Sequence, residues 1–132
     1  SRYCNSVQID EKHILIPCNT ELRIYSFDTR PPLLDENAKE EEKAKEEVFD
    51  ARLEFTQSMA TASIMILRES LKHWVGITYD GEVLMIQKQT VSDIKKSNTF
   101  NLLASCQTNH VYVRHGDISL EGETIAFISE KP

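Results

Sequence analysis

The side chains best suited to catalysis or metal binding are scattered along the chain. They are four histidines and three cysteines: His13, His73, His110, His115, Cys4, Cys18 and Cys106. His110 and His115 bracket a predicted strand and point to opposite faces, so they would not share a metal ion. His13 and Cys18 have the same spacing. The chain also contains no glycine-rich phosphate loop, HExxH motif or CxxC motif. The sequence therefore predicts no cofactor, no metal site and no enzyme activity.

Cys106 and His73 each have two interpretations. Cys106 falls in the apolar stripe of a predicted helix, where a cysteine usually packs as a small core residue. The enzymatic alternative is a small hydrolase that uses Cys106 with His110, and it requires a solvent-accessible thiol. His73 lies on a mostly aliphatic face. We interpret it as a histidine that is hydrogen-bonded within the fold or lies at the edge of this face, in preference to a metal or cofactor ligand. The odd number of cysteines, without paired spacing, fits a reducing compartment, so we expect the protein in the cytosol or the nucleus.

The stretch Thr61–Gln87 is predicted to form two β-hairpins in series, and the rest of the chain is organised around it. Asp80-Gly81 separates two apolar runs, and this dipeptide is a strong hairpin signal because glycine readily adopts the positive φ of a tight turn. With these two residues as the loop, Ile77 pairs with Leu84, and two faces separate. One face is aliphatic and consists of Ile64, Ile66, Val75, Ile77, Leu84 and Ile86. The other face carries Met65, Leu67, Trp74, Val83 and Met85.

Strands are predicted on both sides of this stretch, and one helix follows it. The strands are Lys12–Cys18, Leu22–Phe27, Val48–Ser58 and His110–His115, with Thr124–Ser129 as a last strand or a short helical tail. Asn98–Thr108 is predicted as the one convincing helix, because it has a polar cap at Ser97 or Asn98 and an apolar stripe at helical spacing. The expected fold class is therefore α+β: one antiparallel sheet of about six strands, with one main helix packed on one face.

The second face of this sheet carries the expected function. A half-solvated antiparallel sheet alternates apolar and polar residues, whereas this one is apolar on both sides. A single helix covers only one face, and apolar surface left uncovered normally marks an interface. We therefore expect the second face to pair with the sheet of a partner chain. Its interface residues would be Met65, Leu67, Trp74, Val83 and Met85. The alternative is that the N-terminal hairpin folds back and covers this face within one chain.

Length and composition limit the remaining possibilities. Residues 1–132 are expected to form a single domain, and 40% apolar with 27% charged residues is typical of a soluble globular protein. No apolar run approaches the ~20 residues of a membrane span, so no membrane partner is expected. The net charge of −6 argues against a nucleic-acid partner.

Residues 31–47 differ in composition from the rest of the chain. Arg30-Pro31-Pro32 ends a predicted strand, and Asp35–Glu47 then contains almost no apolar side chain. One interpretation is an acidic, flexible insertion that stays solvated. The other is an acidic patch that docks on a basic partner.

Several motifs occur in an order that is found in a known family. They are Ala51-Arg52-Leu53, Met65-Ile66-Leu67, Ser70-Leu71, Trp74-Val75-Gly76, Leu102-Leu103-Ala104, Thr108-Asn109 and Val111-Tyr112-Val113. Together with Ile14–Asp28, which is similar to an opening pair of strands, they resemble the proteasome assembly chaperone four family. These motifs are packing patterns and not catalytic signatures, and the acidic segment departs from the family pattern.

The resemblance implies a specific, non-enzymatic function. Members of this family form a heterodimer with a related chain, the proteasome assembly chaperone three type, in which the two sheets face each other. The dimer binds an alpha-type subunit of the twenty-S proteasome, promotes alpha-ring assembly and leaves before the particle is complete. The alternative is a structural or adaptor subunit of another hetero-oligomeric complex built on a similar sheet-and-helix unit.

Overall fold

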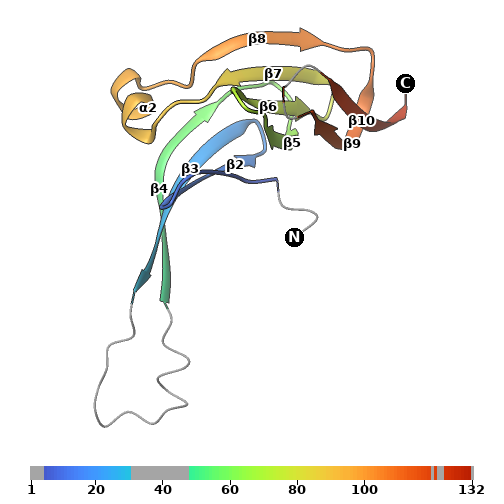
Figure 1. Cartoon of the computed structure of the whole chain (residues 1–132). Helices are drawn as coiled ribbons and strands as arrows, with labels where there is room; N and C mark the ends of the chain where they lie inside the picture. Colours follow the sequence, from blue (N-terminus) through green and yellow to red (C-terminus); the bar gives the residue numbers. More distant parts are fainter. Residues whose placement is uncertain (1–4, 31–47, 120, 122–123, 132) are drawn as a thin grey trace, which may run out of the picture.

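The computed structural model describes residues 5–30, 48–119, 121 and 124–131. Strands make up 63% and helix 7% of the structure. The strands are β1 (Val7–Asp10), β2 (His13–Cys18), β3 (Glu21–Arg30), β4 (Val48–Ser58), β5 (Ile64–Glu69), β6 (His73–Thr78), β7 (Glu82–Gln87), β8 (Leu102–Gln107), β9 (Val111–Ile118) and β10 (Ile125–Lys131). The helix α2 (Val91–Ser97) lies between β7 and β8 (Figure 1).

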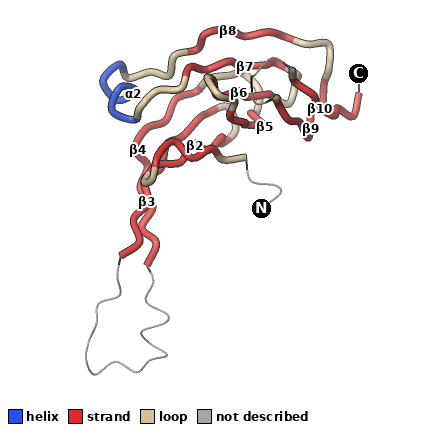
Figure 2. Tube along the Cα trace, in the orientation of Figure 1, coloured by secondary structure: helices blue, strands red, loops and turns tan. Residues whose placement is uncertain are grey.

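The strands form three antiparallel sheets, each of which follows the chain order. The N-terminal sheet has the order β1-β2-β3-β4, the central sheet has the order β5-β6-β7-β8, and the C-terminal hairpin pairs β9 with β10. Figure 2 shows the N-terminal sheet below the central sheet, with β3 and β4 continuing as a two-stranded arm away from the body. A backbone hydrogen bond joins the first two sheets, from the Ile64 N–H of β5 to the Asn19 carbonyl in the turn between β2 and β3.

The main core lies between the N-terminal and central sheets, as in a β-sandwich. Its buried side chains are Val7, Leu15, Leu22, Ile24, Ile64, Leu67, Trp74, Leu84, Ile86, Val91, Ile94 and Phe100. α2 closes one end of this core through Val91 and Ile94. Thr90 begins the helix by accepting a hydrogen bond from the Asp93 N–H at 3.1 Å, and Asn98 ends it in the left-handed conformation.

The expected α+β fold with one main helix is wrong, because the segment expected to be helical is mostly a strand. Asn98 does not start a helix but ends α2, and Leu102–Gln107 pairs with β7 as the fourth strand of the central sheet. An apolar run of this length fits a strand and a buried helix equally well by its pattern. In the folded chain Leu102–Gln107 is a strand because it forms backbone hydrogen bonds with β7. In the described part of the chain, seven residues of helix then remain, too few to cover a sheet face.

The expected pairing of β6 with β7 is also wrong, by one residue. Ile77 pairs with Val83 and not with Leu84, because the loop contains Tyr79 in addition to Asp80 and Gly81. Gly81 has a φ of 86°, and the Glu82 N–H bonds to the Thr78 hydroxyl. This is the three-residue hairpin loop that ends in a left-handed glycine. A slip of one residue exchanges the faces of a strand.

The two faces of the central sheet therefore differ from the expected ones. Met65 lies at a register shift in β5, so Ile64 and Leu67 point to the same side. The inner face, toward the N-terminal sheet, carries Ile64, Leu67, Trp74, Leu84 and Ile86. The outer face carries Ile66, Val75, Ile77, Val83 and Met85.

The N-terminal strands are where the sequence predicted them. The hairpin of β2 and β3 and the long strand β4 are confirmed. Pro17 lies beyond the last pair between β1 and β2, which is Val7 with Leu15, so its missing N–H falls on an unpaired edge. The acidic insertion at residues 31–47 lies outside the described residues.

Candidate interaction surface

The structure separates the five side chains that were expected to form one partner interface. Leu67 and Trp74 are buried between the two large sheets, with exposed fractions of 1% and 2%. Met65 and Val83 are half-buried and pack beside the C-terminal hairpin. Met85 is half-buried on the outer face of the central sheet. The N-terminal sheet thus covers Trp74 within one chain, which is the alternative arrangement considered from the sequence.

The C-terminal hairpin covers one part of the outer face. Ile66, Ile77 and Val113 form a second buried cluster, with Met65, Val83 and Ile125 packed around it. In Figure 1, β9 and β10 lie beside β5 and β6, at one end of the central sheet. Among the described residues, the outer face is exposed at Ala104 and Cys106 of β8 and partly exposed at Met85 of β7.

We call this uncovered part the β7–β8 surface and define it by Met85, Ala104 and Cys106. Met85 pairs with Ala104, and Val83 pairs with Cys106, so these side chains share the outer face. Ala104 and Cys106 are exposed. Every residue of β8 is exposed and none is charged. An apolar, uncharged surface on two neighbouring strands can bind another protein by burial of area, but it offers no group for acid–base chemistry.

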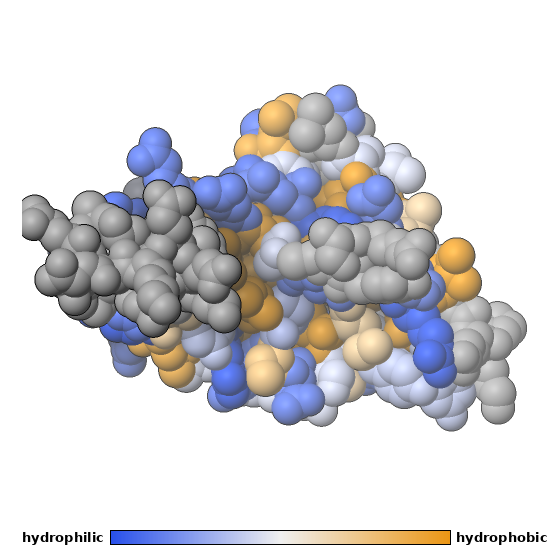
Figure 3. Space-filling model, turned by 90° about the horizontal axis from the view of Figure 1, so that it is seen from below, coloured by the Kyte–Doolittle hydropathy of each residue, from blue (hydrophilic) through white to orange (hydrophobic). Residues whose placement is uncertain are grey.

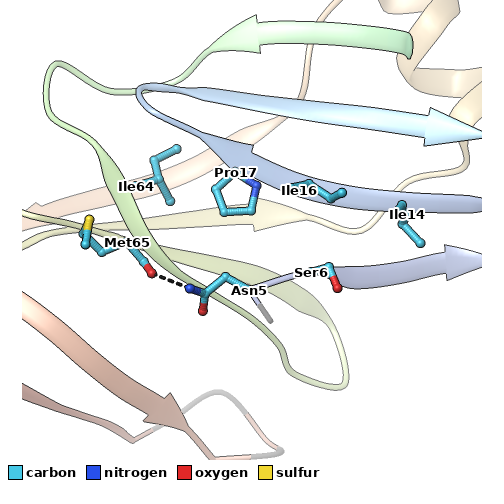
Figure 4. A pocket seen from close by; sticks show the side chains of 7 residues that line it. All are labelled: Asn5, Ser6, Ile14, Ile16, Pro17, Ile64 and Met65. Carbon is cyan, nitrogen blue, oxygen red and sulfur yellow. Dashed lines mark hydrogen bonds between the residues drawn. The ribbon is translucent and has the colours of Figure 1, made fainter. Parts of the chain in front are cut away.

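A second apolar feature is a pocket of about 450 Å³ beside β2 and β5. Ile14, Ile16, Pro17, Ile64 and Met65 line it, together with Asn5 and Ser6 (Figure 4). The Asn5 amide donates to the Met65 carbonyl at 2.7 Å, and its oxygen accepts from Arg68 at 2.7 Å. The one side-chain amide at this pocket is thus bound within the chain, so the pocket can contribute apolar contact and little else.

A third feature is a smaller opening, of about 270 Å³, beside Trp74. Lys88 and Glu69 line it and form an ion pair at 3.0 Å. Among the described residues, neither Trp74 Nε1 nor Gln89 Oε1 has a hydrogen-bond partner, and both residues line this opening. One unpaired donor and one unpaired acceptor can hold a water molecule or a small amide, which is hydrogen-bonding capacity and not catalysis.

The outer face of the N-terminal sheet is mixed in character. Leu53 is half exposed there, at 50%, and pairs with Tyr25. Arg23 donates to the Tyr25 hydroxyl at 3.3 Å and to Glu21 at 2.7 Å. These hydrogen bonds raise the pKa of Arg23 further above its ordinary value. Figure 3, seen from below, shows apolar and hydrophilic side chains interspersed. This face is therefore a weaker candidate than the β7–β8 surface.

The histidines and cysteines do not come together in the described part of the chain. There, no group of three or more His, Cys, Asp or Glu side chains could hold a metal ion. Cys18 is a half-buried free thiol and Cys106 an exposed one. Cys106 thus lies on a strand surface, and the expected position in a helical core is wrong. Within the same residues, no helix has the length and apolar character needed to cross a membrane.

One feature of the sequence marks the β7–β8 surface, although the same residues also fit a helix. Leu102–Gln107 is a run of six residues without a charge, flanked by polar residues on both sides. Comparisons with protein-family models, with curated proteins and with solved structures found no match to this chain.

Proposed function

We propose that this protein is a non-enzymatic assembly chaperone subunit of the proteasome assembly chaperone four type. In this role it pairs with a related chain of the proteasome assembly chaperone three type and binds an alpha-type proteasome subunit, promoting alpha-ring assembly. The resemblance in its packing motifs supports the choice of family. The apolar, uncharged β7–β8 surface supports the choice of a protein partner. We propose the cytosol or the nucleus as its compartment, because free thiols stay reduced there.

The surface offered to the partner differs from the one first expected. Trp74 and Leu67 are unavailable because the chain's own N-terminal sheet covers them. Met85, Ala104 and Cys106 remain on the outer face and present apolar area without charge. A partner sheet that packs over β7 and β8 would bury them, and the C-terminal hairpin would flank the contact.

Co-purification from cells tests the proposal. The tagged wild-type chain is expected to recover a related chaperone chain and at least one proteasome alpha-type subunit, identified by mass spectrometry. Ala104→Asp places a charge on the β7–β8 surface at an exposed position, so it should reduce recovery about tenfold or more while leaving the fold intact. Met85→Asp probes the neighbouring position on β7.

Leu53→Asp is the matched control, because Leu53 is also exposed but lies on the outer face of the N-terminal sheet. It should leave recovery unchanged. Circular dichroism and urea unfolding of each variant establish that the fold is kept. Recovery of subunits from an unrelated complex would favour the adaptor alternative, and equal recovery with Ala104→Asp would contradict the assigned surface.

A further inference from the structure

β8 is an edge strand that has no neighbouring strand on its outer side in the described chain. β7 is its only neighbour in the central sheet, and Figure 1 shows nothing beyond it. The Thr108 N–H donates to the Gly81 carbonyl at 3.1 Å. Because bonded and non-bonded pairs alternate along an antiparallel ladder, Cys106 and Ala104 also bond to β7. The N–H and C=O groups of Ser105 and Gln107 then point away from the sheet.

Several other sheet edges carry features that prevent edge-to-edge association, and β8 does not. β4 has Asp50, Arg52 and Glu54 along its length and a register shift beside Glu54. β1 is only four residues long and is shifted at its end. β9 lies beside β5. By contrast, β8 has six uncharged residues and no proline. Its pairing with β7 shifts register once, between Met85 and Ile86, and is regular over Ala104–Gln107. Uncharged edges without proline readily accept another strand.

The side chains of β8 favour the same conclusion. Leu102 and Leu103 are exposed by 41% and 48%, and Ala104, Ser105 and Cys106 are small enough for a second strand to approach closely. No charged side chain of β8 would have to be desolvated by an added strand.

We propose that β8 is a strand-addition edge at which a second copy of this chain pairs in antiparallel orientation. The two central sheets would then join into one continuous sheet around a two-fold axis through Ser105. In this register the backbones of the two Ser105 residues exchange hydrogen bonds, and Ala104 of each copy lies opposite Cys106 of the other. The inference does not depend on the proposed chaperone function.

Charge is the reason for choosing a second copy as the occupant. In a two-fold pair every residue of β8 meets a residue of β8, and an uncharged strand brings no like charges together. Residues 31–47 contain seven acidic and three basic side chains, so they hold −4 of the net charge of −6. The remaining sequence carries a net charge of −2. Two six-residue strands bury less than the ~1,000 Å² of a stable interface, so the dimer should be reversible and concentration-dependent.

Sedimentation velocity of the purified full chain tests this, in reducing buffer so that Cys106 cannot form a disulfide. The wild type should shift from monomer to dimer between micromolar and near-millimolar concentration. Ser105→Pro should stay monomeric, because the proline removes an N–H that points outward and places its ring in the path of the second strand. The ladder between β7 and β8 loses no hydrogen bond, so the urea midpoint should change little.

Ser105→Lys is a second variant that keeps the strand conformation. It places two lysines opposite each other across the proposed axis and should also abolish the dimer. Hydrogen exchange supplies an independent readout, since the Ser105 and Gln107 amides should gain protection as concentration rises. A wild type that stays monomeric throughout, or a Ser105→Pro variant that is folded and dimerises as the wild type does, would overturn the proposal.

Discussion

Gly81 lies directly against the backbone carbonyl of His110: a Cβ atom on Gly81 would come within 2.1 Å of that oxygen. The Thr108 hydroxyl also donates to the Gly81 carbonyl, at 2.7 Å. The loop between β6 and β7 is therefore fixed against the segment that connects β8 to β9. Through this contact the β6–β7 loop sets where the C-terminal hairpin begins and which part of the outer face it leaves uncovered.

Gly81→Ala should lower the free energy of unfolding by about 2 kcal/mol or more. The added methyl group meets the His110 carbonyl, and alanine is strained at a φ of 86°. Gly76→Ala is the matched control, because its Cβ would find Ile64 at 3.5 Å and Leu84 at 3.7 Å, which are ordinary contacts. Its effect should stay within about 1 kcal/mol. Urea unfolding followed by circular dichroism measures both, and equal losses would contradict the close approach.

The fluorescence of Trp74 should show that the N-terminal sheet of the same chain covers the inner face of the central sheet. It is the only tryptophan and is 2% exposed, so the isolated monomer should show blue-shifted fluorescence that moves to the red on unfolding. Trp74→Ala should cost about 3–5 kcal/mol, as for other large core side chains. A charged residue at Trp74 would therefore unfold the chain and cannot serve as a selective test of partner binding. Solvent-exposed emission from the folded monomer would be incompatible with this core.

Gln57 should stabilise the turn that leads from α2 into β8. Its side-chain oxygen accepts from the Phe100 N–H at 2.7 Å, and its amide donates to the Thr99 hydroxyl at 3.0 Å. Gln57→Ala leaves the Phe100 N–H without this acceptor and should cost about 1–3 kcal/mol. Gln57→Glu keeps an acceptor and should lose less. Urea midpoints at neutral pH distinguish the two variants, and identical midpoints would argue against a role for the Phe100 bond.

Asp10 should make stability depend on pH in the acid range. Partial burial raises its pKa, but hydrogen bonds from the Lys12 N–H and from His13 outweigh this, and the pKa ends below its ordinary value of 3.8. A carboxylate with a lowered pKa contributes stability above its ordinary pKa and loses it as the pH falls through the folded value. The contribution is small because the side chain is 48% exposed.

Asp10→Asn tests this sign. The variant should be less stable than the wild type at neutral pH, and the difference should shrink below about pH 4 as the wild-type carboxylate takes up its proton. Urea midpoints measured at a series of pH values show the trend. If the stability difference between the wild type and Asp10→Asn instead grows toward low pH, the pKa of Asp10 is not lowered in the folded chain.

The sequence by itself determined most of the strands. Alternation of apolar and polar residues located β4, turn residues located the hairpin of β2 and β3, and Asp80-Gly81 located the turn between β6 and β7. These signals are local, because each depends on side-chain spacing and turn chemistry within about ten residues. It also showed that the central stretch is apolar on both of its faces.

Only the tertiary structure decided which side chains share a face and what covers them. One extra loop residue, Tyr79, placed Leu84, Ile86 and Trp74 together, and one register shift at Met65 placed Ile64 on the same side as Leu67. Neither feature can be read from spacing alone. Leu102–Gln107 became a strand because β7 offered it a ladder. Trp74 was expected at a partner interface, yet the chain's own N-terminal sheet buries it. Such pairings join residues far apart in sequence, and the free energy that selects them comes from burial and hydrogen bonds that no local pattern contains.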